Sequence, residues 1–122
     1  MVNNMNYPNY IFININNLKN NINYLKKEYN YQYYILDVSN NAFNHGIYIV
    51  NYLQELIDYL YVSNFADVLL IRKYNQEIPI IYNGLINKDN IYDLILHNVI
   101  LIIKQKHILD SILNLKIKDK ID

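Results

Sequence analysis

Apolar and polar positions follow two periods along the chain, and these periods predict strands and helices in turn. Short runs of β-branched and aromatic residues bounded by polar residues are typical of strands. Apolar residues that recur every three or four positions are typical of amphipathic helices. Strands are predicted over residues 10–15, 33–38, 59–62, 78–82 and 99–103.

Amphipathic helices are predicted between these strands and after the last of them. Asn16 is a residue type that caps helix N-termini, and Ser63 or Asn64 has the same role before a later helix. Arg72 is expected to place its aliphatic stem on the apolar face of that helix. The predicted helices cover about 16–29, 47–57, 64–72, 88–97 and 105–115.

This strict alternation predicts an α/β fold with a parallel sheet built from βαβ units. The strand cores are apolar at successive positions, so we expect them to be buried on both faces. Either a doubly wound sheet or a (β/α)₈ barrel has this pattern. A complete barrel needs roughly 200 residues or more. The 122 residues here predict a partial TIM-type barrel of about half the full number of strands.

Composition narrows the function classes. Lys+Arg and Asp+Glu both number 11, so the formal net charge is zero. A neutral chain has no broad electrostatic attraction to nucleic acid or anionic membranes, and we expect neither as a partner. The chain has no Cys, and its three His residues lack metal-ligand spacing, so no metal site is predicted.

The ends of the chain carry no targeting signal that we recognise. The first residues lack a basic segment followed by an apolar run, and the apolar run 99–103 is far too short to span a bilayer. We therefore expect a cytoplasmic protein with no membrane association. Residues 1–9 are expected to form a loose tip, and 116–122 a polar tail.

Ligands of parallel α/β folds bind beyond the carboxyl ends of the strands. Of the segments that follow the predicted strands, residues 39–46 have the most unusual composition. They read Ser39-Asn40-Asn41-Ala42-Phe43-Asn44-His45-Gly46.

This segment resembles the Lys-Ala-Asp-Ala-Tyr-Gly-His-Gly signature that alanine racemases carry after their first barrel strand. Ala42, His45 and Gly46 are identical to the signature, and Phe43 is a near match. The segments YIFININNLKNNINYLKK, VSNFADVLLIRK and PIIYNGLINKDNIYDLILHNVILII are also similar to that family. The resemblance covers nearly all of residues 1–122 as one racemase-like N-terminal region.

The resemblance implies a site for pyridoxal 5′-phosphate. In that family the signature lysine forms an imine with the cofactor, and the tyrosine hydroxyl contacts its phosphate. This chain has Ser39 and Phe43 at those two positions, and Leu85 occupies a Gly-Leu turn that would border the pyridine ring. Serine cannot form an imine, so covalent binding of the cofactor is not expected here.

Each candidate residue also has a structural interpretation. Ser39 is either a nucleophile or a loop or capping serine, and His45 is either an acid–base group or a structural part of its loop. Lys104 either supplies a substitute amine at the same mouth or is a solvated lysine before the next helix. Leu85 either borders a cofactor or belongs to the core.

Three functions follow. The first is a degenerate or truncated, non-catalytic relative of alanine racemase, inactive as this chain alone. The second is a non-catalytic interaction module that pairs through its open barrel edges, as a homo-oligomer or with a partner chain that completes the barrel. The third is a doubly wound domain that binds a phosphate-containing ligand, although the chain has only two glycines, Gly46 and Gly84, and no Gly-rich phosphate loop.

Overall fold

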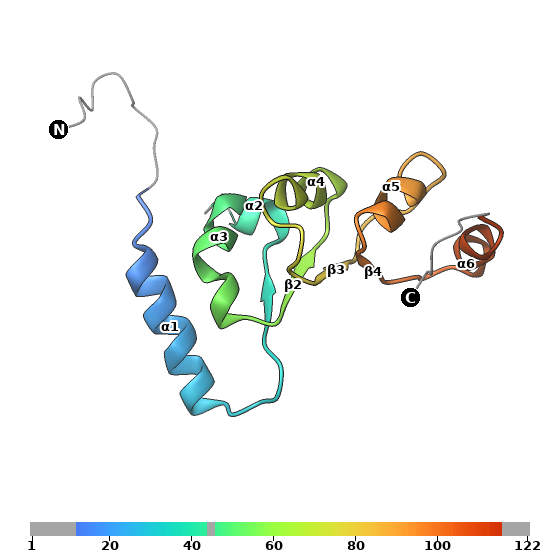
Figure 1. The fold of residues 1–122 in the computed structure, drawn as a ribbon. Helices are drawn as coiled ribbons and strands as arrows, with labels where there is room; N and C mark the ends of the chain where they lie inside the picture. The colour runs from blue at the N-terminus through green and yellow to red at the C-terminus, as the bar shows by residue number, and fades with distance from the viewer. Residues whose placement is uncertain (1–11, 44–45, 116–122) are drawn as a thin grey trace, which may run out of the picture.

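The computed structural model of the chain describes residues 12–43 and 46–115. Four parallel strands form one sheet in the order β1-β2-β3-β4, and helices alternate with them (Figure 1). Because β1 and β4 are not paired with each other, the sheet is open and corresponds to part of a barrel. The predicted α/β fold class is confirmed. The strands are β1 (Ile35–Asp37), β2 (Tyr59–Val62), β3 (Ile80–Tyr82) and β4 (Ile100–Leu101).

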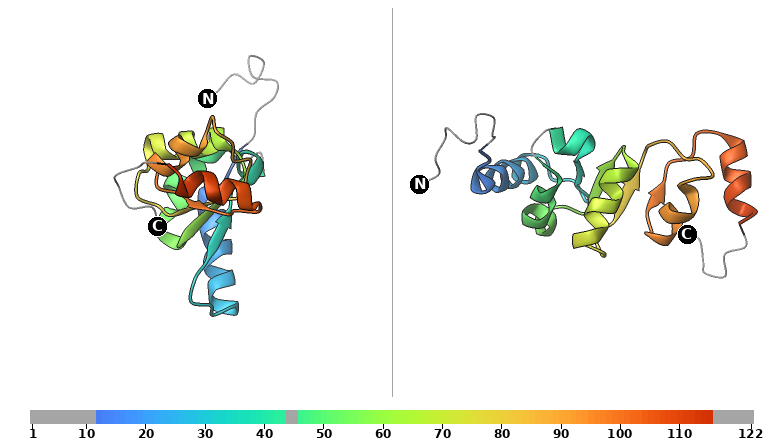
Figure 2. Two further views of the ribbon diagram at one scale, coloured as in Figure 1. Left: turned by 90° about the vertical axis from the view of Figure 1, so that its right-hand side faces the viewer. Right: turned by 90° about the horizontal axis from the view of Figure 1, so that it is seen from above.

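Five α-helices, the left-handed segment α2 and two short 3₁₀ helices accompany the strands in the described part of the chain. From above, the elements follow one another in a row from α1 to α6 (Figure 2). They are α1 (Ile15–Glu28), α2 (Ser39–Phe43), η2 (Ile47–Ile49), α3 (Val50–Leu53), η3 (Gln54–Leu56), α4 (Phe65–Tyr74), α5 (Ile91–Leu96) and α6 (Lys106–Leu113). Among the described residues, no helix has the length and apolarity that crossing a membrane requires.

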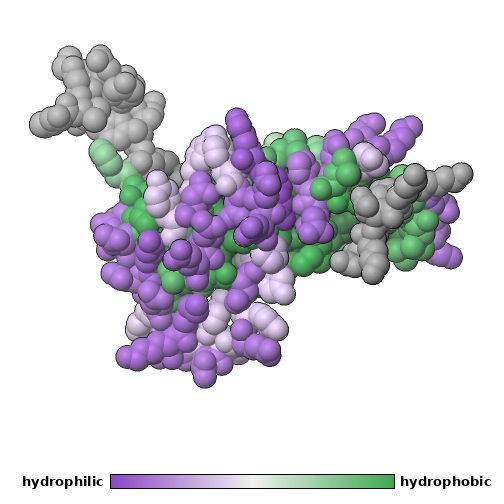
Figure 3. All heavy atoms as spheres, viewed as in Figure 1, coloured by the Kyte–Doolittle hydropathy of each residue, from purple (hydrophilic) through white to green (hydrophobic). Residues whose placement is uncertain are grey.

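The core lies around the two central strands. Leu60 and Val62 of β2 and Ile80 of β3 are fully buried, and Val68 of α4 and Leu94 of α5 belong to the same apolar cluster. Alternate residues of β2 and β3 are only half-buried, because they face the open side of the sheet. Hydrophobic residues also come to the surface toward α5 and α6 (Figure 3).

The prediction that every strand is buried on both faces is wrong for the outer strands. Ile35 of β1 and Ile100 of β4 are 55% and 48% exposed. Among the described residues, each of these strands pairs along one edge only, so its other edge has no neighbouring strand. The outer strands therefore show the features of an unfinished barrel.

The predicted opening strand over residues 10–15 is also wrong where the structure describes it. Ile15 is the first residue of α1, and the side chain of Asn14 accepts a hydrogen bond of 3.1 Å from the backbone N–H of Asn17. Asn14 is thus the N-cap, two residues before the predicted cap Asn16. The predicted loose tip 1–9 and the tail 116–122 lie outside the described residues.

The helix predicted over residues 47–57 is broken into η2, α3 and η3. At Leu53, between α3 and η3, the backbone departs from regular α-helical geometry, with φ −111° and ψ −7°. Its buried positions nevertheless include Ile47, Val50 and Leu53, which the periodicity placed on the inner face. The pattern predicted the face correctly and the regularity of the helix incorrectly.

Arg72 links α4 to the segments that lead into β3 and β4. It is 6% exposed, and its guanidinium donates hydrogen bonds of 2.8 Å to the carbonyl oxygens of His97 and Ile78. It also donates to the carbonyl oxygens of Asn75 and Asn98. Burial lowers the pKa of Arg72 from its ordinary value. The predicted inward stem is confirmed, and the charged end joins two loops, the one before β3 and the one before β4.

Candidate functional site at the carboxyl edge of the sheet

The carboxyl ends of the four strands meet at one edge of the sheet because the strands are parallel. Ser39, Ser63, Asn83 and Lys104 follow β1, β2, β3 and β4 in turn. Neighbouring strands lie about 4.8 Å apart, so Ser39 and the segment after β3 are roughly 10 Å apart across the edge. This edge is the candidate site.

The segment after β1 forms one left-handed helical turn. Asn40, Asn41 and Ala42 have φ values of 54°, 55° and 55°. Asparagine tolerates this conformation, whereas it costs alanine about 1–2 kcal/mol. The turn is held because Ala42 N–H donates to the carbonyl oxygen of Val38, and the side chain of Asn41 accepts from the N–H of Ile47 at 3.0 Å.

The segment after β3 is held by a different set of contacts. The Tyr82 hydroxyl donates to the carbonyl oxygen of Leu85 at 2.7 Å, and the side chain of Asn90 donates to the same oxygen at 2.8 Å. Burial raises the pKa of Tyr82 above its ordinary value. A Cβ on Gly84 would lie 2.5 Å from the Tyr82 hydroxyl and 2.6 Å from the carbonyl oxygen of Ser63. Only glycine fits this approach.

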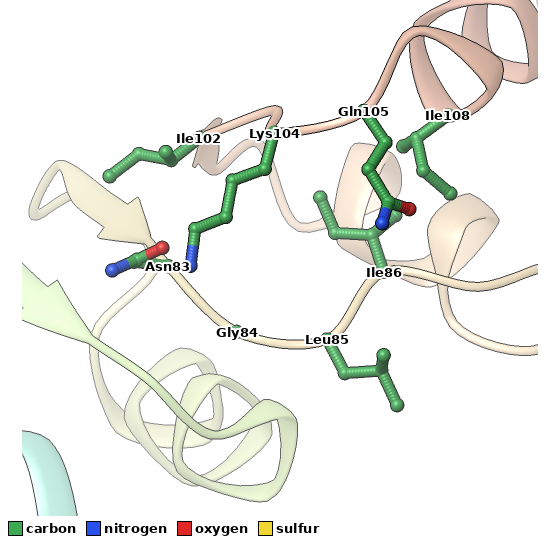
Figure 4. Close-up of a pocket in the computed structure, with 8 residues that line it drawn as sticks. All are labelled: Asn83, Gly84, Leu85, Ile86, Ile102, Lys104, Gln105 and Ile108. Atoms are coloured by element: carbon green, nitrogen blue, oxygen red, sulfur yellow. The ribbon is translucent and has the colours of Figure 1, made fainter.

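A cavity of about 420 Å³ opens between the segment after β3 and the segment that leads from β4 into α6 (Figure 4). Its size is within the range of small-molecule sites. Apolar side chains and the polar groups of Asn83, Lys104 and Gln105 line it together. The Lys104 side chain points across the cavity toward Asn83. The described residues hold no cluster of three or more metal-ligating side chains.

The predicted site residues divide between the two segments. Ser39 is buried at the start of the left-handed turn, and its N–H donates to the Asp37 carboxylate at 2.9 Å. Phe43 ends α2, whereas its side chain and His45 lie outside what the structure describes. Leu85 lines the cavity and is 74% exposed, so the alternative that it belongs to the core is wrong. The edge does not bring Ser39 and Leu85 into one cavity.

Sequence reasoning did not identify Asn83 and Gln105 as residues of a site. Asn83 follows β3 directly and Gln105 precedes α6, so their positions at strand and helix ends were the available signal. Nothing in the sequence showed that both side chains meet Lys104 around one cavity.

Comparison with solved structures decides which fold this is. Over 80% of this chain, the structure matches alanine racemase from Oenococcus oeni with a TM-score of 0.71 and 23% sequence identity. Over 84% of the chain, it matches alanine racemase from Clostridium difficile 630 with a TM-score of 0.74 and 21% identity. The chain has an alanine racemase-like fold.

The match with these racemases covers only 29% and 30% of their lengths. No family model and no curated protein sequence matches the chain. The likeness to alanine racemases therefore lies in the fold, and the four-stranded open sheet corresponds to less than a third of either solved chain.

The residues present at the end of β1 do not fit a covalently bound pyridoxal phosphate. An imine needs an amine, and residues 37–42 read Asp-Val-Ser-Asn-Asn-Ala, which contains none. No catalytic step through that cofactor follows from this racemase-like fold.

Proposed function

We propose that the chain is the N-terminal region of an alanine racemase-like barrel, spanning residues 1–122, that does not racemise amino acids by itself. The observation that carries this proposal is Ser39, a hydroxyl residue at the end of β1 within an otherwise racemase-like scaffold. Without an amine at this point, pyridoxal phosphate has no covalent anchor beside the left-handed turn. Ser39 then serves as a loop residue, and Phe43 and Leu85 are apolar remnants of a cofactor site.

The test restores the lost groups. The purified chain is mixed with pyridoxal phosphate, the imine absorption band is recorded, and borohydride reduction followed by peptide mapping locates any adduct. We expect no adduct at the strand ends of the unaltered chain and an adduct at residue 39 of the double variant Ser39→Lys, Phe43→Tyr.

A matched control places the same amine on the neighbouring strand. Ser63→Lys puts a lysine after β2, where Ser63 is exposed, and it should form no more imine than other surface lysines. Racemisation of alanine by the unaltered chain would contradict the proposal. Equal labelling of residues 39 and 63 in the two variants would also contradict it, because the site would then have no racemase-like geometry.

A second function is pairing through the open edges of the sheet, and the exposure of Ile35 and Ile100 favours it. A parallel edge strand offers unpaired N–H and C=O groups to another strand. We propose that a second copy of the chain occupies these edges, which would supply the strands that the partial barrel lacks.

Molar mass measured by light scattering over a range of concentrations tests this pairing. Ile35→Lys and Ile100→Lys should each shift the equilibrium toward monomer, because lysine on an edge opposes strand pairing. Leu69→Lys is the control, since Leu69 is 40% exposed on α4, away from both edges. If the unaltered chain stays monomeric at every concentration, pairing between copies is contradicted. A complex that forms only with another protein would show that a different chain pairs with these edges.

A further inference from the structure

The cavity between the segments after β3 and β4 carries one positive charge in its lining. Lys104 is the one ionisable residue among those that line it, and no described acidic side chain forms an ion pair with it. The side chain points across the cavity toward Asn83 (Figure 4). Lys104 is exposed, and an ammonium group at the margin of a cavity attracts an anion.

The start of α6 adds to this positive potential. Gln105 and Ile108 line the cavity, so the first turn of α6 borders it. The N-cap residue Gln105 makes no side-chain capping hydrogen bond. The uncapped N–H groups of a helix N-terminus favour negative charge nearby. Lys104 and α6 therefore act in the same direction.

Asn83 adds a hydrogen-bond acceptor that lacks a donor. Its side-chain N–H donates to the hydroxyl of Tyr61, while its side-chain oxygen is buried with no hydrogen-bond partner among the described residues. That oxygen lies on the side of Asn83 that faces Lys104 (Figure 4). A buried acceptor without a donor is unfavourable, and a ligand hydroxyl would satisfy it once the Asn83 side chain turns this oxygen toward the cavity.

The remaining walls of the cavity are largely apolar. Ile86, Ile102 and Ile108 contribute aliphatic side chains, and Leu85 stands at the margin with most of its surface exposed. A fully polar ion would leave these walls without a partner. An apolar body attached to the anionic group would cover them.

We propose that this cavity binds a small carboxylate with a hydroxyl group and an aliphatic body, that is, an apolar hydroxy acid. Lys104 and the α6 N-terminus hold the carboxylate, Asn83 accepts a hydrogen bond from the hydroxyl, and the isoleucines pack against the body. A carboxylate fits better than a phosphate because a single lysine balances a single negative charge. The binding is non-covalent and independent of whether residue 39 once held a cofactor.

Isothermal titration calorimetry of the full 122-residue chain with 2-hydroxy-4-methylpentanoate tests the proposal. The neutral 2-hydroxy-4-methylpentanamide and the hydroxyl-free 4-methylpentanoate are the comparison ligands, and inorganic phosphate is the comparison anion. We expect the amide to bind at least tenfold more weakly than the hydroxy acid, and 4-methylpentanoate severalfold more weakly.

Two lysine variants distinguish a specific contact of Lys104 with the ligand from a general electrostatic attraction by the positive charges of this region. Lys104→Met keeps the aliphatic stem and removes the charge, and should weaken binding of the hydroxy acid at least tenfold. Lys106→Met removes the same charge from an exposed α6 residue outside the lining, and should change the affinity less than twofold. Lys104→Arg should retain most of the affinity.

Several results would overturn the proposal. They are failure of the hydroxy acid to bind, equal affinity for acid and amide, and equal losses in the two Met variants. Tighter binding of inorganic phosphate than of the hydroxy acid would overturn the choice of a carboxylate. None of these outcomes bears on the imine test of residue 39, so the two proposals fail separately.

Discussion

The segments after β1 and β3 lie at the same edge of the sheet, yet they differ in what they offer a ligand. The segment after β1 is a left-handed turn closed by its own hydrogen bonds, and its described side chains at the turn are Ser39, two asparagines and an alanine. The segment after β3 contributes instead to a cavity with a lysine and a buried, unpartnered amide oxygen. Among its described residues, the turn after β1 thus offers no amine, whereas an amine and an unpartnered amide oxygen lie after β4 and β3.

Arg72 holds the loops that lead into β3 and β4 and makes no such contact before β1, so its loss should produce the largest effect. Arg72→Met leaves the carbonyl oxygens of Ile78 and His97 without their donor, and we expect a loss of about 3 kcal/mol in the free energy of unfolding. Urea denaturation measures this loss. Hydrogen exchange should show faster opening at β3 than at β1.

Lys73→Met is the control for Arg72, because Lys73 is exposed and its ammonium contacts the ring of Tyr74 at 5.6 Å. A change within about 0.5 kcal/mol is expected there. If Arg72→Met were equally mild, or if β1 opened as readily as β3, the four carbonyl contacts would not distinguish the two sides of the sheet.

Each of the two segments contains one glycine, and we expect the two glycines to be required for different physical reasons. Gly84→Ala forces a Cβ against the Tyr82 hydroxyl and the Ser63 carbonyl, and overpacking of this kind costs about 1–3 kcal/mol. Gly46→Ala meets no atom within 4 Å but keeps a φ of +91°, and such backbone strain also costs about 1–3 kcal/mol.

Substitution of each glycine by asparagine distinguishes backbone strain from lack of space in the same unfolding experiment. Gly46→Asn should recover part of the stability, because asparagine tolerates positive φ better than alanine does. Gly84→Asn should be worse than Gly84→Ala, because space is the limit there. The reverse order would show that the causes have been assigned to the wrong segments.

The left-handed turn should be weakened by removing its side-chain hydrogen bond. Asn41→Ala loses the acceptor for the Ile47 N–H and places alanine at φ 55°, so we expect a loss of about 1–2 kcal/mol. Asn40→Ala is the matched control, since Asn40 has the same backbone conformation with no side-chain hydrogen bond among the described residues. Equal losses in thermal unfolding would mean that the Asn41 side chain does not hold the turn.

The smallest effect concerns the pH dependence of the segment after β3. Burial raises the pKa of Tyr82 above its ordinary value of 10.0, so the folded state keeps this proton longer than the unfolded state. The resulting stability is present below about pH 10 and is lost as the pH rises through the folded-state pKa. Tyr82→Phe should flatten the fall in the urea midpoint at high pH. An unchanged slope would show that the Tyr82 hydroxyl is not buried from solvent.

The order and approximate bounds of most helices and strands could be predicted from the sequence, because each depends on the apolar pattern of a short segment. The bounds of β2 and the capping role of Asn64, whose side chain accepts from the Ala66 N–H at 2.7 Å, agree with the prediction. The opening strand failed because Asn14 competes locally for a backbone N–H and starts a helix inside an apolar run. A run of β-branched residues does not reveal that competition.

The site was less accessible from the sequence. Three successive residues in a left-handed conformation are too costly for propensity to suggest, so the segment 39–43 was expected to be an ordinary loop. The rule that ligands bind at strand ends did point to Lys104. Its meeting with Asn83 around one cavity depends on side-chain directions from two strands, which no local pattern encodes.

The most direct test of the difference between the two segments is a ¹⁵N–¹H NMR titration of the labelled chain with 2-hydroxy-4-methylpentanoate. Binding at the cavity predicts saturable shifts in the amides of residues 83–86 and 104–105, with the amides of residues 39–42 unmoved. Shifts centred on residues 39–42 would contradict this account, because the binding chemistry would then lie at the end of β1.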